Sequence, residues 1–199
     1  MSSVVKFREI KREIRILGVD DGGFIHKRGN RAEVIGVVFR GGHWMEGIMF
    51  TDVEVDGTDA TDRIAEMIFK SPHMEQVRVI ITDGLTFAGF NVVDITSLFD
   101  RSGIPVIAVA DKKPDVDEVK KALQNLSDWE KRWNSILNAG EMITVNTQRD
   151  LNPLYVQIAG ISKKDAVEIV VKSATRSRIP EPLRVAHLIA SGLTHHRIV

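Results

Sequence analysis

The chain has 199 residues, of which 43% are apolar and 27% are charged, a composition typical of a folded globular protein. One hydrophobic core suffices at this length, so we expect a single domain covering residues 1–199. Lys plus Arg and Asp plus Glu both number 27, and this zero net charge excludes indiscriminate binding to nucleic acid by a basic chain.

Further classes are excluded by what the sequence lacks. Cysteine is absent, which excludes disulfides, thiolate metal ligands and a cysteine nucleophile. No apolar run has the length of a signal-peptide core or of a helix that crosses a bilayer. We therefore expect a cytoplasmic protein with no membrane partner.

The first third of the chain has the pattern of three consecutive strands. Residues 14–20 are a β-rich run that ends in two aspartates and two glycines, and residues 32–40 and 44–55 follow after short loops. Short connections between successive strands predict an antiparallel meander.

The rest of the chain alternates between helical and strand patterns. Residues 59–69, 94–99, 116–123, 127–139, 162–173 and 183–193 are predicted helices, with capping-box spacing at Ser127/Glu130 and a cap at Ser162/Asp165. Residues 77–82 and 105–110 are nearly continuous apolar runs, which predict strands buried on both faces, and 142–145 and 154–158 are late strands. This order predicts an α/β protein with one mixed sheet and helices on both faces.

Three aspartates occupy positions where chemistry is expected. Asp20 ends the first strand, Asp83 ends the most buried strand, and Asp62 lies in the first turn of the helix between them. Ligands of open α/β sheets gather at the carboxyl ends of strands, and three converging carboxylates would suit Mg²⁺. Alternatively, all three residues only form turns and helix caps.

Several stretches resemble known families. Residues 16–20 (ILGVD), 79–84 (VIITDG) and 178–187 (RIPEPLRVAH) match the order and approximate spacing of motifs in endonuclease V. Residues 20–22 (DDG), 40–42 (RGG), 56–61 (DGTDAT) and 83–94 (DGLTFAGFNVVD) resemble signatures of its mainly archaeal homologues, sometimes labelled endonuclease dU. The resemblance implies a ribonuclease H-like fold in which three antiparallel strands precede helix-linked parallel strands.

The resemblance also implies a function and its site. It implies a Mg²⁺- or Mn²⁺-dependent endonuclease that cleaves DNA containing deoxyuridine, with Asp20, Asp62 and Asp83 as catalytic metal ligands. In endonuclease V an acid precedes the Asp-Gly pair at a spacing that reaches Asp62 when counted back from Asp83. The family's histidine is matched by Ile161, so Asp21, Lys112 or water would have to replace it.

Several other residues could have either a functional or a structural role. Phe87 and Phe90 could stack on an unpaired base and Asn91 could read its edge, or the two rings could pack in the core. Lys112, or the basic loop with His26, Lys27, Arg28 and Arg31, could hold phosphates, or that loop could simply be a solvated charged loop. A surface or capping role is expected for Arg184 and His187, and a packing role for Trp129 and Trp133.

Two functions from different classes follow. The first is a metal-dependent phosphodiesterase that acts on nucleic acid, with DNA as the expected partner. The second is a non-catalytic descendant that binds nucleic acid or another protein, which the loss of the histidine and the neutral charge would favour.

Overall fold

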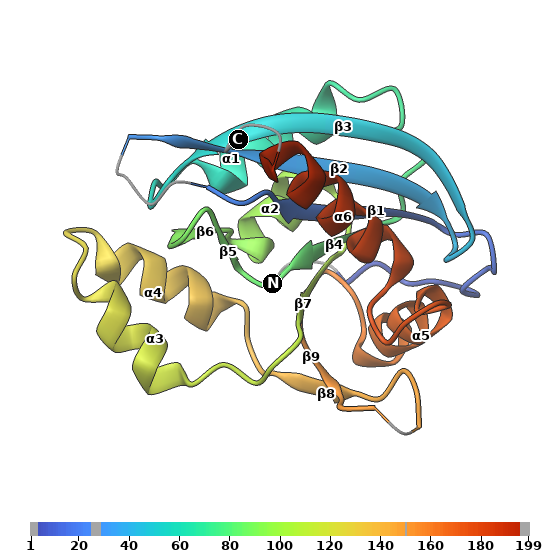
Figure 1. Ribbon diagram of the computed structural model, residues 1–199. Helices are drawn as coiled ribbons and strands as arrows, with labels where there is room; N and C mark the ends of the chain where they lie inside the picture. Colours follow the sequence, from blue (N-terminus) through green and yellow to red (C-terminus); the bar gives the residue numbers. More distant parts are fainter. Residues whose placement is uncertain (1–3, 25–28, 150, 196–199) are drawn as a thin grey trace.

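A seven-stranded mixed sheet runs through the structure, a computed structural model that describes residues 4–24, 29–149 and 151–195 (Figure 1). The strand order is β3-β2-β1-β4-β7-β9-β8. The strands are β1 (Arg15–Asp21), β2 (Arg31–Arg40), β3 (Trp44–Glu54), β4 (Val79–Asp83), β7 (Val106–Ala110), β8 (Ile143–Val145) and β9 (Leu154–Ala159).

The predicted antiparallel meander is confirmed. β1, β2 and β3 pair antiparallel, and β4 lies beside β1 and parallel to it, with Val19 opposite Thr82. β7 continues the parallel part of the sheet. Asp20 and Asp83 consequently reach the same end of the sheet.

β1, β4 and β7 are the parallel strands that the resemblance implied, and the two late strands complete the sheet in mixed directions. β9 pairs antiparallel with β7, and β8 pairs antiparallel with β9. β8, which follows α3 (Val116–Leu123) and α4 (Trp129–Asn138), therefore runs in the same direction as β7, and the chain reverses its direction only between β8 and β9 (Figure 1).

Helices cover both faces of the sheet. α1 (Ala60–Phe69) and α2 (Ile95–Ser102) pack on one face, where Leu17, Val19 and Ile80 contribute to the core. α5 (Lys163–Ser173) and α6 (Glu181–His195) pack on the other. α3 (Val116–Leu123) and α4 (Trp129–Asn138) lie to one side.

Two local features depart from the sequence-based expectation. α4 begins at Trp129 with Asp128 as its N-cap residue, so the Ser127/Glu130 box does not form; the Asp128 carboxylate accepts hydrogen bonds from Arg132 instead. The loop after β4 contains a short hairpin of β5 (Thr86–Phe87) and β6 (Asn91–Val92). The Ser162/Asp165 cap is present.

Among the described residues, no helix combines the length and the apolar character that crossing a bilayer requires.

Candidate metal centre

Asp20 and Asp83 project from the same face of the sheet at the ends of adjacent strands. Side chains alternate between faces along a strand, so Asp20 shares a face with Ile16, and Asp83 shares that face with Val79 and Ile81. This is the face that α6 covers. Two carboxylates are thereby brought together by strand register alone.

His187 of α6 completes the cluster. Its Nδ1 lies 2.8 Å from Oδ2 of Asp20, and one ligand atom each from Asp20, Asp83 and His187 lie within 4.8 Å of one another. No other group of this kind occurs in the part of the chain that the structure describes. The imidazole is 62% exposed, whereas the Asp20 side chain is 2% exposed.

The helix can approach β1 this closely because of a glycine. A Cβ atom on Gly18 would lie 2.3 Å from the carbonyl carbon and oxygen of Pro182. Any side chain at position 18 would therefore push the start of α6 away from the sheet. With Gly18 there, the next turn of α6 carries His187 to Asp20.

The structure thus places a histidine beside the two aspartates, where the resemblance led us to expect none. His187 lies at the surface, as expected, but its ring also contacts Asp20. Ile161, which stood where the resemblance placed a histidine, is buried in the core beside β9 and forms a β-bridge with Val5. The sequence signal was the RIPEPLRVAH segment itself, whose last residue is the ligand candidate.

Burial and mutual repulsion perturb these carboxyl groups. Burial, followed by the charges of Asp83 and Asp21, raises the pKa of Asp20 from 3.8 to about 7, against the hydrogen bond from His187. Loss of hydration also raises the pKa of Asp83, although this residue is exposed at the surface. Carboxyl groups whose pKa values are raised by burial and by neighbouring negative charge are good ligands for a cation. The positive charge of the cation offsets both effects and favours the ionised form.

The side chain of Asp21 points to the face of the sheet opposite Asp20 and has a different role. Its Oδ2 accepts a hydrogen bond of 2.7 Å from the backbone N–H of Ala88, in the loop between β5 and β6. Burial raises the pKa of Asp21 to about 6. Asp21 thus anchors the loop and does not replace the histidine.

Asp62 lies outside the cluster, contrary to the expectation from spacing. It lies in the first turn of α1, its side chain is 67% exposed, and it forms an ion pair with Arg101 of α2. The count back from Asp83 assumed a chain without insertions. The structure leaves a cluster of two carboxylates and an imidazole.

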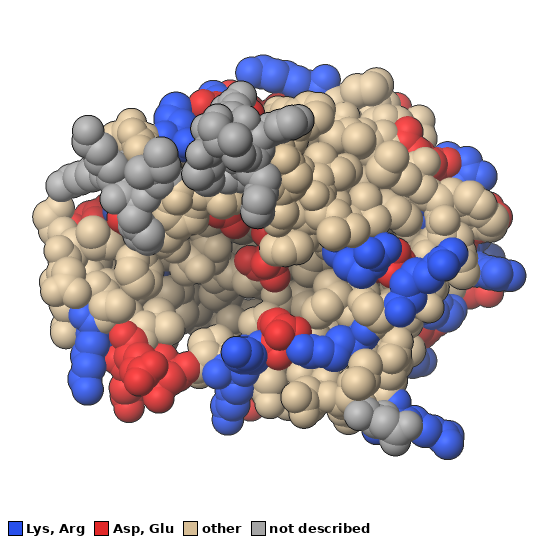
Figure 2. All heavy atoms as spheres, in the orientation of Figure 1, with Lys and Arg blue, Asp and Glu red and all other residues tan. Residues whose placement is uncertain are grey.

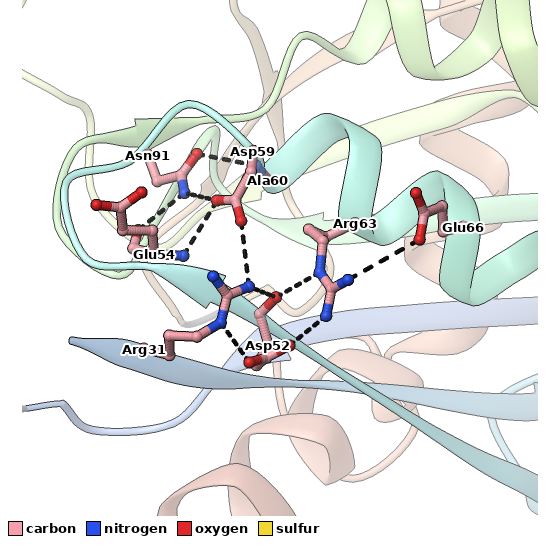
Figure 3. A network of polar contacts seen from close by, with 8 residues as sticks. All are labelled: Arg31, Asp52, Glu54, Asp59, Ala60, Arg63, Glu66 and Asn91. Carbon is pink, nitrogen blue, oxygen red and sulfur yellow. Dashed lines mark hydrogen bonds and ion pairs between the residues drawn. The ribbon is translucent and has the colours of Figure 1, made fainter. Parts of the chain in front are cut away.

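Asn91 is a structural residue, because its amide is fully used inside the fold (Figure 3). Its Oδ1 accepts from the N–H of Ala60 at 3.0 Å, and its Nδ2 donates to the Glu54 carbonyl at 2.9 Å and to Asp59 at 2.7 Å. It is completely buried, so it cannot read a base edge. Figure 3 shows the network continuing from Asp59 to Arg31, Asp52 and Arg63.

The two phenylalanines differ from each other. Phe87 is completely buried in the core, which excludes base stacking. Phe90 is half-buried, and its N–H donates to Asp56 at 2.9 Å. Lys112 is exposed directly after β7, near this end of the sheet, whereas His26, Lys27 and Arg28 lie outside the described residues.

Arg132 of α4 fixes the loops beside the cluster, and sequence reasoning missed it. Its side chain is 6% exposed, and its donors bind Asp128 and the carbonyl oxygens of Asp56, Gly57 and Phe90. Asp56 and Ala88, which share a backbone hydrogen bond of 2.9 Å, both have positive φ angles. Such strained residues persist only where their surroundings hold them.

An apolar pocket of about 230 Å³ begins one residue after Asp83. Gly84, Leu85 and Thr86 form one wall, and residues of α3, α4 and β9, including Trp133, Tyr155 and Gln157, form the others. Figure 2 shows a hollow on this face with acidic side chains at its rim. Trp133 therefore lines a pocket in addition to packing.

Comparison with known proteins gives one family and several similar structures. The family model described as endonuclease dU matches residues 12–194. A UPF0215 protein of Methanothermobacter thermautotrophicus is 54% identical over 189 residues, which are 94% of this chain and 91% of that protein. A protein of unknown function from Archaeoglobus fulgidus has a solved structure with 35% identity and a TM-score of 0.80, covering 90% of this chain and 97% of that one.

Two more distant structures share the fold. Human endonuclease V has a TM-score of 0.68 at 17% identity, covering 100% of this chain and 93% of that one. Endonuclease V of Ciona intestinalis, in complex with a 24mer DNA containing an inosine followed by a ribo-adenosine, has a TM-score of 0.60 at 18% identity, covering 93% of this chain and 87% of that one.

Proposed function

This chain belongs to the endonuclease dU family, and on that premise we propose that it is a metal-dependent endonuclease that cleaves phosphodiester bonds in DNA containing deoxyuridine. The observation that carries the proposal is the cluster of Asp20, Asp83 and His187, with ligand atoms within 4.8 Å of one another. A protein that only bound a partner would have no use for two crowded carboxylates with raised pKa values.

The donor set suits Mg²⁺ or Mn²⁺. Both ions favour carboxylate oxygens and water, and an added imidazole is compatible with Mn²⁺. Asp20, Asp83 and His187 would hold the ion. A divalent ion at this place supplies positive charge that stabilises the phosphate oxygens and activates a water molecule.

The side chains would prepare the site for that ion and for the substrate. Asp20 orients the imidazole of His187 through Nδ1, which leaves the rest of the ring exposed toward an incoming phosphate. Asp83 stands at the open side of the cluster, where a substrate phosphate can approach. Asp21 holds Ala88 and with it the loop between β5 and β6.

The apolar pocket after Asp83 would receive the unpaired base. Its volume of about 230 Å³ suits one nucleobase, and Trp133 and Tyr155 supply aromatic surface. Thr86 and Gln157 supply polar groups there. Lys112 would contact a phosphate beside the same end of the sheet. The complex of the Ciona endonuclease V with DNA supports a nucleic-acid substrate for this fold.

A cleavage assay tests the proposal. The protein is incubated with Mg²⁺ or Mn²⁺ and with oligonucleotides that carry uracil, hypoxanthine or no lesion, and cleavage of the uracil strand is expected to exceed the other two. Asp83→Asn should abolish cleavage, whereas Asp62→Asn should retain it, because Asp62 lies outside the cluster.

Two outcomes would reject the proposal. Cleavage of no strand with either ion would favour a non-catalytic protein that binds nucleic acid or another protein. Loss of cleavage in Asp62→Asn but not in Asp83→Asn would place the active centre elsewhere.

A further inference from the structure

The apolar pocket of about 230 Å³ after Asp83 is formed where small residues of the sheet face α3 and α4. Ala108 and Ala110 of β7 project from the same face and leave space between the sheet and the two helices, which lie beside it in Figure 1. Trp133 and Ile136 of α4 close the opposite side. Few polar groups line such a pocket, so one that is fixed in position determines the ligand that it can bind.

Gln157 of β9 is a polar side chain that strand register directs into this space. It lies opposite Ala108, while Tyr155 lies opposite Ala110, and both side chains line the pocket. Val156, which stands between them along the strand, belongs to the core on the other face of the sheet. Gln157 therefore projects into the volume that the alanines leave free.

The amide of Gln157 is held in one orientation. Its Nε2 donates a hydrogen bond of 2.9 Å to the carbonyl oxygen of Gly140. A carbonyl oxygen can only accept, so reversing the amide would break this bond. Gly140 does not line the pocket, and no group in the described part of the chain donates to Oε1 of Gln157. The pocket therefore has an oriented hydrogen-bond acceptor that no protein donor occupies.

An acceptor in a fixed orientation distinguishes pyrimidines by the hydrogen on N3. Uracil carries this hydrogen and can donate it to Oε1, whereas cytosine has a lone pair on N3 that would face the oxygen. A site built to bind one hydrogen-bonding group rejects a ligand that leaves its buried polar atoms unpaired. Thymine keeps the N3–H, so this contact separates uracil from its parent base cytosine and not from thymine.

We propose that Gln157 determines the base specificity of the pocket, with its Oε1 accepting a hydrogen bond from N3–H of an unpaired uracil. The inference rests on the proposed function, which it extends from the presence of a base to the atom that identifies it. The wall beside the candidate metal centre is fixed, because the N–H of Gly84, the residue after Asp83, donates to the Val109 carbonyl at 2.8 Å.

The test measures binding without cleavage. Fluorescent single strands of about 13 deoxyadenosine nucleotides, with uracil, cytosine or N3-methyluracil as the central base, are titrated with protein in EDTA, and anisotropy is the readout. N3-methyluracil keeps both carbonyl groups of uracil and lacks only the N3–H. The uracil strand should bind about tenfold more tightly than the other two, as expected for one hydrogen bond.

Two variants separate recognition of the base from a structural role of the same side chain. Gln157→Leu keeps a side chain of similar size and removes the acceptor, so the three strands should bind with nearly equal affinity. Thr96→Val is the matched control, because the Thr96 hydroxyl also donates to a carbonyl at the end of α4, that of Asn138 at 3.3 Å, but does not line the pocket. Its preference for uracil should remain about tenfold.

The outcomes distinguish this inference from the proposed function. Equal binding of the three strands by the native protein, or a tenfold preference that persists in Gln157→Leu, would overturn the role of Gln157 and leave a nuclease that cleaves uracil-containing DNA intact. An equal loss of affinity for all strands in Gln157→Leu would identify the bond to Gly140 as its only role and overturn the inference too. A preference for uracil that depends on Gln157, in a protein that cleaves no strand, would support the inference and overturn only the proposed reaction.

Discussion

Replacing Asp20 by Asn should stabilise the metal-free protein at alkaline pH. The Asp20 side chain is 2% exposed, and burial with the nearby charges of Asp83 and Asp21 raises its pKa from 3.8 to about 7. Between these values the folded protein binds a proton that the unfolded chain has released. Stability of the metal-free protein therefore falls as the pH rises through this window.

The size of the effect follows from the pKa. A displacement from 3.8 to about 7 corresponds to roughly 4 kcal/mol at pH 8. Part of this free energy comes from the coupled ionisation of Asp21 and Asp83, which changes when residue 20 becomes neutral. We therefore expect Asp20→Asn to raise the free energy of unfolding by about half of it, or roughly 2 kcal/mol. An amide keeps the acceptor for the Asp21 N–H and a partner for His187.

Thermal unfolding in EDTA is the assay. For a chain of this length roughly 2 kcal/mol corresponds to a rise in Tm of about 4–8 °C at pH 8. At about pH 3, below 3.8, the Asp20 carboxyl is protonated in both the folded protein and the unfolded chain, so the two proteins should unfold at nearly the same temperature. Mn²⁺ at about 100 times its Kd should add about 3 kcal/mol to the native protein, and little to the variant.

Two results would refute this reasoning. A variant that is less stable than the native protein at pH 8 would mean that the Asp20 carboxylate is already compensated without metal. A gain of equal size at about pH 3 and at pH 8 would mean that the effect comes from packing and not from charge.

Three further substitutions test how the site is held. Gly18→Ala should cost about 3 kcal/mol and weaken Mn²⁺ binding in calorimetry, because its Cβ collides with the start of α6; Gly192→Ala, which meets nothing within 4 Å, should do neither. Asn91→Ala should lower the free energy of unfolding in urea by about 3 kcal/mol, because buried groups lose their partners, while the base preference of any cleavage stays unchanged. Arg132→Met should lower the free energy of unfolding by a similar amount. An unchanged free energy of unfolding would show that the carbonyl groups bound by Arg132 do not require this partner.

Much of the fold could be predicted from the sequence because its signals are local. The apolar run at 79–83 and the β-rich run at 15–21 depend only on which residues tolerate a pleated, buried backbone. Parallel pairing of these two strands then places Asp20 and Asp83 together, since side chains alternate with a period of two. Sequence pattern and spacing could therefore predict two of the three cluster residues.

The third residue was decided by tertiary structure. His187 and Asp20 are 167 positions apart, and they meet because Gly18 lets α6 lie against β1. Spacing counted along the chain failed at Asp62 for the same reason, since position in a helix does not determine which element that helix faces. Asn91 looked like a base-reading amide until its three partners, from residues 31 to 37 positions away, were seen to use it completely. A sequence determines which side chains can hydrogen-bond or ligate, but the partners that satisfy them come from distant segments, and only packing brings those segments together.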